Sequence, residues 1–290
     1  MWTTAEGLDA VTSRTVSAGG ASFPDPGAAR PVAARVTVHA PDLAAVTPIA
    51  ALTLAHITVQ PMPGDRFLVV GARSRWRPDG PDRNGVLYDT DGQVVAEHVL
   101  GDGIEHVLAT SSGQVWAGYF DEGIYGNYGW GRADTEQPVG AYGIVRFSPG
   151  LEPGWHYPGY SEAGSWGPID DCYALNVDDT GAWACYYSGF PVVCIRDGIV
   201  TGWHNDIRGA RALAVTDSRV ALFGGYGPDY DRLAVAEFGA DRAGPAGEYR
   251  VVLPDGEPLP AGTQVIGRGS RLHFLTDTSW YQLDMDDIPG

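Results

Sequence analysis

Four titratable side chains in this chain could move a proton between the protein and a ligand. His106 follows Glu105 directly, and a neighbouring carboxylate sets the tautomer of a histidine ring and favours its protonated form. Asp121 and Glu122 form an acid pair after an apolar run, and Asp171 is the second residue of an Asp-Asp pair. The candidate catalytic residues are therefore His106, Asp121, Glu122 and Asp171. Each has a structural alternative: a partly exposed histidine, a capped turn, or backbone hydrogen bonds at the start of a strand.

Aromatic and basic side chains accompany these acids and suit a polar ligand. Aromatic rings stack on the C–H faces of sugars and other polyols, while carboxylates accept hydrogen bonds from the hydroxyl groups. Arginines could clamp a carboxylate or phosphate in bidentate fashion, or could neutralise the neighbouring acids. The candidate binding residues are Glu105, Tyr119, Tyr128, Trp130, Tyr173, Tyr187, Arg208, Arg211 and Tyr226. Packing against one another is the alternative role of the aromatic residues.

Metal and cofactor motifs are scarce in the sequence. The segment Asp89-Thr90-Asp91-Gly92 lacks the downstream glutamate of an EF-hand loop. We find no Gly-x-Ser-x-Gly elbow, no phosphate loop and no dinucleotide fingerprint. We therefore expect no cofactor, with Ca²⁺ as the alternative, because oxygen donors for it exist at Glu105, Asp121, Asp170 and Asp171.

Five copies of a strand–turn–strand pattern must position these residues. The polar turns are at 63–66, 111–114, 178–181, 216–219 and 268–271. A short apolar segment such as ITVQPM or CYALNV precedes each turn, and another such as FLVVGA or VWAGYF follows it, which predicts β-hairpins. A third apolar segment recurs at 85–89, 143–147, 191–195, 232–238 and 280–284, and a turn and a fourth strand follow most of these.

Four antiparallel strands in each repeat of roughly 40–65 residues are typical of a β-propeller. Such sheets are apolar on both faces, and only a closed ring buries the first and the last of them. The last copy, 262–286, supplies three strands, and residues 35–52 resemble only the later strands of a copy. We therefore predict an all-β, five-bladed propeller whose ring is closed by pairing of N-terminal and C-terminal strands. Six blades are the alternative if residues 1–55 form their own blade. The predicted domains are a partly irregular arm, 1–34, and a single propeller, 35–290.

The repeats resemble a known superfamily. The segment GQVWAGYF (113–120) and its counterparts are similar to repeats of the broad β-propeller superfamily that contains streptogramin lyases and lactonase-like enzymes. The resemblance covers residues 56–286 and concerns strands and turns. It implies the propeller fold and no specific family or activity, because fold does not carry function.

The candidate residues gather at two kinds of position in the predicted blades. They lie at the start of the first strand or in the loop between the second and third strands, which in propellers open on the same face, by analogy. The loop at 125–142 is longer than a hairpin needs. We predict a polar, sugar-like or carboxylate-bearing small molecule in a central funnel, with acid–base chemistry of hydrolase, lyase or cyclase type. The alternative is a non-catalytic protein–protein interaction propeller or an inhibitor of a basic partner.

The net charge of the chain limits the classes of molecule that it is expected to bind. There are 36 acidic and 19 basic residues, for a formal net charge of −17. This argues against nucleic acid and membranes, and it leaves a basic protein as a partner to consider. The N-terminus has neither a basic start nor an apolar run, no stretch reaches the length of a membrane span, and the three cysteines match no zinc or CxxC spacing. We expect a cytoplasmic protein with reduced cysteines.

Overall fold

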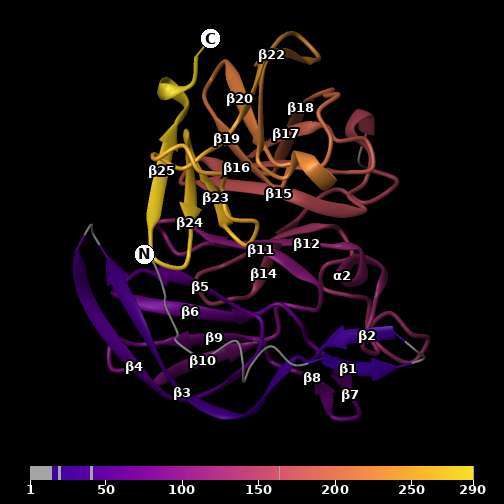
Figure 1. Cartoon of the computed structure of the whole chain (residues 1–290). Coiled ribbons are helices and arrows are strands. Elements are labelled where there is room, and N and C mark those ends of the chain that lie inside the picture. The colour runs from indigo at the N-terminus through magenta and orange to yellow at the C-terminus, as the bar shows by residue number, and fades with distance from the viewer. Residues whose placement is uncertain (1–14, 19–20, 40–41, 163, 290) are drawn as a thin grey trace. The chain divides into compact units, whose positions relative to one another are not determined.

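The computed structural model describes residues 15–18, 21–39, 42–162 and 164–289 (Figure 1). It is an all-β structure that divides into two compact units, Met1–His156 and Tyr157–Gly290, here called unit 1 and unit 2. Among the described residues, no helix is long and apolar enough to span a membrane.

Unit 1 contains two four-stranded antiparallel sheets and three two-stranded sheets. The first four-stranded sheet has the order β10-β9-β6-β5 and consists of β5 (Ile57–Met62), β6 (Arg66–Gly71), β9 (Gly85–Tyr88) and β10 (Val94–His98). The second has the order β11-β12-β13-β14 and consists of β11 (Ile104–Ala109), β12 (Val115–Tyr119), β13 (Ile144–Phe147) and β14 (Pro153–His156). The two-stranded sheets pair β1 (Thr15–Ala18) with β2 (Ala21–Pro24), β3 (Gly27–His39) with β4 (Leu43–Leu54), and β7 (Trp76–Arg77) with β8 (Gly80–Pro81). A short helix, α2 (Asp121–Tyr125), follows β12.

Unit 2 contains three successive groups of antiparallel strands. The first is β15 (Asp171–Asp178), β16 (Gly181–Tyr187), β17 (Val192–Arg196) and β18 (Ile199–Trp203). The second is β19 (Ala212–Val215), β20 (Arg219–Phe223), β21 (Arg232–Phe238) and β22 (Ala243–Arg250), and the third is β23 (Gln264–Arg268), β24 (Arg271–Leu275) and β25 (Trp280–Asp284). Short 3₁₀ helices lie at Gly164–Trp166, Gly227–Asp229 and Met285–Asp287.

In the β19–β22 sheet of unit 2, the strands β19, β20 and β21 are buried on both faces. Side chains alternate between the two faces along a strand. Leu213 and Val215 of β19 pack into a core shared with the β15–β18 strands, whereas Ala212 and Ala214 pack into a core shared with β23–β25. β19, β20 and β21 therefore read as largely apolar runs, because each face meets a neighbouring sheet, whereas most residues of the outer strand β22 are half-buried or exposed. The sequence prediction of sheets that are apolar on both faces is confirmed here.

A buried amide joins the inner strands of the three groups in unit 2. The Asn176 side chain is 0% exposed. Its Nδ2 donates to the carbonyl oxygens of Leu213 at 2.8 Å and Gly269 at 2.9 Å, and its Oδ1 accepts from the Gly269 N–H at 2.8 Å. Asn176 also forms a parallel β-bridge with Gly267. The side chain thus supplies hydrogen bonds where inner strands meet without a full ladder.

Unit 1 has a comparable buried amide at the matching register. Gln60 lies two residues before Met62, the last residue of β5, as Asn176 lies two residues before Asp178, the last residue of β15. Gln60 Oε1 accepts a hydrogen bond from the N–H of Ala109 on β11 at 3.1 Å. In both units, a buried amide at the same point of the hairpin therefore ties an inner strand to the next sheet.

The predicted hairpins are confirmed, whereas the predicted closure is wrong. The five hairpins are β5-β6, β11-β12, β15-β16, β19-β20 and β23-β24. Instead of joining the last blade, β3 pairs with β4 as a separate sheet, and among the described residues β25 pairs with β24 alone. The β3–β4 hairpin forms in place of the predicted pairing with the last blade, because its strands are long and closing a short loop loses little chain entropy.

The β3–β4 hairpin also buries its apolar side within unit 1. Val36, Ile49 and Leu52 form a core with Phe67 and Val69 of the first four-stranded sheet. The blade count and the single-domain assignment stay predictions. Of the arm predicted at 1–34, residues 1–14 and 19–20 lie outside the described residues, and the rest contains β1, β2 and the first part of β3.

Candidate functional site

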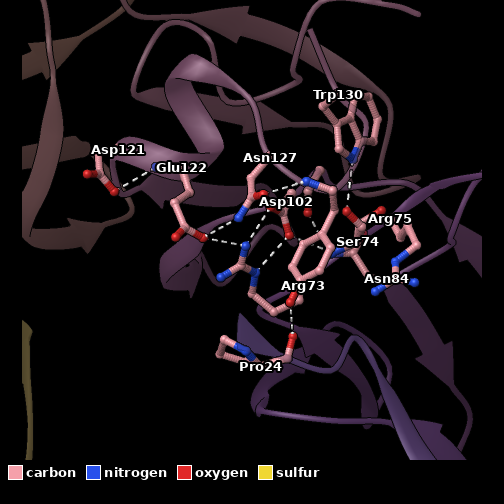
Figure 2. A network of polar contacts seen from close by, with 12 residues as sticks. Pro24, Arg73, Ser74, Arg75, Asn84, Asp102, Asp121, Glu122, Asn127 and Trp130 are labelled. Atoms are coloured by element: carbon pink, nitrogen blue, oxygen red, sulfur yellow. Dashed lines mark hydrogen bonds and ion pairs between the residues drawn. The ribbon is translucent and has the colours of Figure 1, made fainter. Parts of the chain in front are cut away.

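A buried ion pair connects the segment after β6 to the segment before β11 in unit 1 (Figure 2). Arg73 Nε donates to Asp102 Oδ1 at 2.9 Å, and Arg73 Nη2 donates to Oδ2 at 2.8 Å. The backbone N–H of Ser74 also donates to Asp102 Oδ1 at 2.9 Å. The two charged side chains are only 4% and 1% exposed. This bidentate geometry is the strong form of the arginine–carboxylate interaction.

Glu122, a candidate catalytic residue, extends the same network from α2. Its Oε2 accepts a hydrogen bond from Arg73 Nη2 at 2.6 Å and another from Asn127 Nδ2 at 2.7 Å. Its side chain is 31% exposed. Both donors address one oxygen, and Oε1 accepts no described hydrogen bond. Two hydrogen bonds on one carboxylate oxygen, one of them from an arginine, favour a structural role for Glu122 over proton transfer.

Burial shifts the pKa values of both charged groups in the Arg73–Asp102 pair. Burial by itself lowers the pKa of the Arg73 guanidinium, but the hydrogen bonds and charges of Asp102 and Glu122 outweigh it and raise that pKa. Burial raises the pKa of the Asp102 carboxyl, and the hydrogen bonds from Arg73 and Ser74 offset only part of this rise. Each group thus favours the charged form of the other, against the effect of burial.

Two glycines bring α2 into direct backbone contact with Asp102. A Cβ atom at Gly103 would lie 2.3 Å from the backbone nitrogen of Gly123, and a Cβ atom at Gly123 would lie 2.3 Å from the carbonyl oxygen of Asp102. No side chain fits at either position. Gly103 also has a φ of +68°, a conformation that favours glycine. This close approach places Glu122 within reach of Arg73.

Two predicted binding residues of unit 1 lie in the core instead. Tyr119 is 0% exposed and donates its hydroxyl to the carbonyl oxygen of Leu100 at 2.5 Å, and burial raises its pKa. Trp130 is 4% exposed and donates its indole N–H to the carbonyl oxygen of Ser74 at 2.9 Å. Large aromatic residues with one polar atom are well suited to such positions. Both residues hold the loops in place and present no surface to a ligand.

Tyr128 lies at the edge of the network. Its ring faces the guanidinium groups of Arg73 and Arg75, with 4.7 Å and 4.9 Å between the guanidinium carbons and the ring centroid. Its hydroxyl donates to the carbonyl oxygen of Pro24, and burial raises its pKa. Its φ of +47° is unusual for a residue with a side chain. Tyr128 and Glu122 thus both contact Arg73, and Tyr128 forms an arginine–tyrosine stack.

The remaining candidate residues of unit 1 are Glu105, His106 and Asp121. His106 is half-buried on β11, opposite Gly118 of β12, and Glu105 is exposed. Asp121 is exposed, and its Oδ1 accepts a hydrogen bond from the Glu122 N–H at 2.7 Å. This contact matches the capped-turn alternative for Asp121.

In unit 2, three predicted tyrosines come together. The ring centroid of Tyr173 lies 6.3 Å from that of Tyr187 and 6.3 Å from that of Tyr226, and the hydroxyls of Tyr173 and Tyr226 are 3.2 Å apart. Tyr187 and Tyr226 are 46% and 55% exposed. Phe190, which is buried, packs edge-on against Tyr173 and Tyr187. Tyr173, Tyr187 and Tyr226 are called the tyrosine cluster below.

Charged residues adjoin the tyrosine cluster. Asp171, a candidate catalytic residue, pairs in register with Tyr187 across β15 and β16. Burial is the main cause of the raised pKa of Tyr173, and the charge of Asp171 adds to it. Asp171 is thus close enough to act on the cluster electrostatically.

Arg211 borders the same surface through the loop that carries Tyr226. Its Nη2 donates to the carbonyl oxygen of Tyr230 at 2.8 Å, and its Nε is buried without a hydrogen-bond partner. The ring of Tyr226 lies on Gly209, where a Cβ atom would be 3.0 Å from it. Arg208 is exposed, and its carbonyl oxygen accepts a hydrogen bond from Arg232 Nη2 at 2.6 Å.

The predicted site residues therefore divide between the units. Glu122 and Tyr128 both contact Arg73 in unit 1, and Asp171, Tyr187 and Tyr226 lie at the tyrosine cluster in unit 2. Sequence reasoning missed Asp102, the centre of the unit 1 network. The signal in the sequence was an acid between two glycines, Gly101-Asp102-Gly103. In the structure, both glycines have positive φ and the acid is buried. Among the described residues, no group of three or more His, Cys, Asp or Glu is arranged to hold a metal ion.

Comparison with known proteins assigns no family to the whole chain. A model of the YxzG family matches residues 163–225, which is less than half of the chain. The match lies within unit 2 and includes Tyr173, Tyr187 and Arg211. No curated protein matches the sequence.

Solved structures of β-propeller type resemble the chain at low identity, as the sequence predicted. PorZ of Porphyromonas gingivalis is 8% identical with a TM-score of 0.46, and the match covers 94% of this chain but only 33% of PorZ. AztD of Citrobacter koseri is 11% identical with a TM-score of 0.43, over 93% of this chain and 68% of AztD. BamB of Moraxella catarrhalis is 14% identical with a TM-score of 0.40, over 94% and 73%. With TM-scores below 0.5, none of these carries an argument about what this chain does.

Proposed function

We propose that this protein is a β-propeller-type binding protein that holds a polar, sugar-like or carboxylate-bearing small molecule at the tyrosine cluster of unit 2. The carrying observation is the convergence of Tyr173, Tyr187 and Tyr226, two of which expose about half of their surface. Exposed aromatic residues grouped with polar atoms are typical of ligand contacts, whereas scattered exposed apolar residues need no explanation.

The surroundings of the cluster support a polar ligand. The rings offer faces to the C–H groups of a sugar, and the hydroxyls of Tyr173 and Tyr226 offer donors and acceptors. Arg211 uses Nη2 on a backbone carbonyl and has no described hydrogen bond at Nη1, so one terminal nitrogen is available for an acceptor on the ligand. Asp171 supplies a carboxylate on the strand that carries Tyr173.

Binding accounts for the geometry better than acid–base catalysis does. Of the predicted proton-transfer residues, Glu122 is occupied by Arg73 and Asn127, and Asp121 accepts a backbone N–H. Both contacts are those of structural carboxylates. The tyrosine cluster, by contrast, combines exposure with converging polar groups.

The prediction for this site concerns Tyr226 and Tyr187. Replacing either by alanine will weaken binding of the ligand roughly 2- to 12-fold, because a well-formed aromatic contact contributes about 0.5–1.5 kcal/mol. Isothermal titration calorimetry against neutral sugars, sugar acids and hydroxy acids measures the change. The control is Tyr125→Ala, which removes a tyrosine of similar exposure, 59%, from unit 1.

Two outcomes would contradict the proposal. One is a ligand whose affinity falls equally in Tyr125→Ala and Tyr226→Ala. The other is absence of heat with every small molecule together with a tight complex with a basic protein, which would establish the protein–protein alternative that the net charge of −17 suggests.

A further inference from the structure

Arg75 of unit 1 is a half-buried cation without a counter-ion among the described residues. It lies between β6 and β7, and its Nε is buried without a hydrogen-bond partner. Nη1 and Nη2 donate no described hydrogen bond and, unlike Nε, are not buried. Buried N–H groups in proteins nearly always have a hydrogen-bond partner, so the unpaired Nε of Arg75 is unusual.

The other two arginines of the segment are neutralised. Arg73 is paired with Asp102 and Glu122. Arg77 is paired with Asp82, and it donates to both carboxylate oxygens. Asp82 contacts Arg75 through backbone groups: its Oδ2 accepts from the Arg75 N–H at 3.3 Å, and its own N–H donates to the Arg75 carbonyl oxygen at 2.9 Å. The side chains of Asp82, Asp102 and Glu122 are thus engaged by Arg73 and Arg77, which leaves the Arg75 guanidinium without an ion pair of its own.

Tyr128 orients the Arg75 side chain before any ligand binds. The ring of Tyr128 faces its guanidinium at 4.9 Å, and the Tyr128 hydroxyl is held by the carbonyl oxygen of Pro24. A guanidinium that stacks on an aromatic ring keeps its edge free for in-plane hydrogen bonds. In Figure 2, Arg75 is drawn without a dashed line to its guanidinium, next to Arg73, which donates through Nε and Nη2.

We propose that Arg75 is a binding site for the carboxylate of a small organic acid, which it holds end-on through Nη1 and Nη2. A planar carboxylate matches the two parallel donors of a guanidinium edge. A singly charged carboxylate is repelled less here than a phosphate dianion, because the acids Asp82, Asp102 and Glu122 are bound to the neighbouring Arg73 and Arg77. The site lies in unit 1 and is independent of the tyrosine cluster.

Residue-resolved chemical modification tests this site. Phenylglyoxal reacts with accessible guanidinium groups, and the absence of lysine from the sequence makes the peptide map simple to interpret. We expect Arg75 to react faster than the buried, paired Arg73, with the exposed Arg83 as the reference in the same segment. Benzoate at 50 times its dissociation constant, about 98% occupancy on a one-site isotherm, will slow modification of Arg75 at least about tenfold and leave Arg83 unchanged.

Two further probes distinguish a carboxylate site from a site for neutral molecules or for phosphate. Benzamide, the neutral isostere of benzoate, is expected to give no protection of Arg75. Inorganic phosphate is expected to protect less than benzoate at equal concentration. Equal protection by benzamide, stronger protection by phosphate, or no protection by benzoate would each overturn the carboxylate site.

Variants make the test independent of the reagent. Benzoate will raise the melting temperature of Arg83→Gln protein as it does that of the unaltered chain, whereas Arg75→Gln protein will lose this rise. Both variants are made in an Arg211→Gln background, so that the cation beside the tyrosine cluster contributes nothing to the signal. Loss of the rise in both variants would contradict the assignment to Arg75, and failure at the tyrosine cluster would leave this result unaffected.

Discussion

Asp102→Ala will lower the free energy of unfolding by about 3–5 kcal/mol, the largest loss expected for any single carboxylate of this chain. The substitution leaves the guanidinium of Arg73, 4% exposed, without its bidentate partner. It also removes the acceptor for the Ser74 N–H. Urea unfolding measures the loss, and hydrogen exchange of peptides from 66–131 shows whether it is confined to the loops of this network.

The double variant Arg73→Met/Asp102→Leu separates charge burial from packing. Because it removes both charges, we expect it to lose less stability than Asp102→Ala alone. The matched control is Asp206→Ala, which breaks the exposed ion pair with Arg242 and should leave the unfolding midpoint almost unchanged. A double variant as unstable as the sum of the two single variants would show that Arg73 and Asp102 act separately.

Asn176→Ala will lower the free energy of unfolding by about 2–4 kcal/mol, because it leaves buried backbone groups without hydrogen bonds. The Leu213 carbonyl loses its described side-chain donor, and the Gly269 N–H loses its acceptor. The Gly269 carbonyl keeps the hydrogen bond from Val215, which limits the loss. The measurement is again urea unfolding, with hydrogen exchange of peptides containing Val215 and Gly269 as the local readout.

Asn176→Asp tests the direction of the hydrogen bonds. An aspartate retains an acceptor for the Gly269 N–H but places a carboxylate against the carbonyl oxygens of Leu213 and Gly269, so we expect it to be no better than alanine. The control Thr201→Val changes an exposed residue on β18 and should have little effect. A fully stable Asn176→Asp protein would show that the two donated hydrogen bonds contribute little.

Local patterns in the sequence determined much of the secondary structure. The turns at 63–66 and 178–181 lie between the strands that they were expected to join, because turn residues and β-branched or aromatic runs act within a few residues. The apolar run at 212–215 correctly indicated a sheet covered on both faces.

Only the tertiary structure decided which charges and amides meet. Asp102 and Arg73 are 29 residues apart, and nothing in their local sequence shows that one will neutralise the other inside the protein. Tyr119 resembled its aromatic neighbours in the sequence, yet burial and the Leu100 carbonyl make it part of the core. The pairing of β3 with β4 was missed because strand patterns carry no information about which partner competes best. Hydrogen bonds and ion pairs between distant segments depend on how sheets pack, which the local preferences of a chain do not contain.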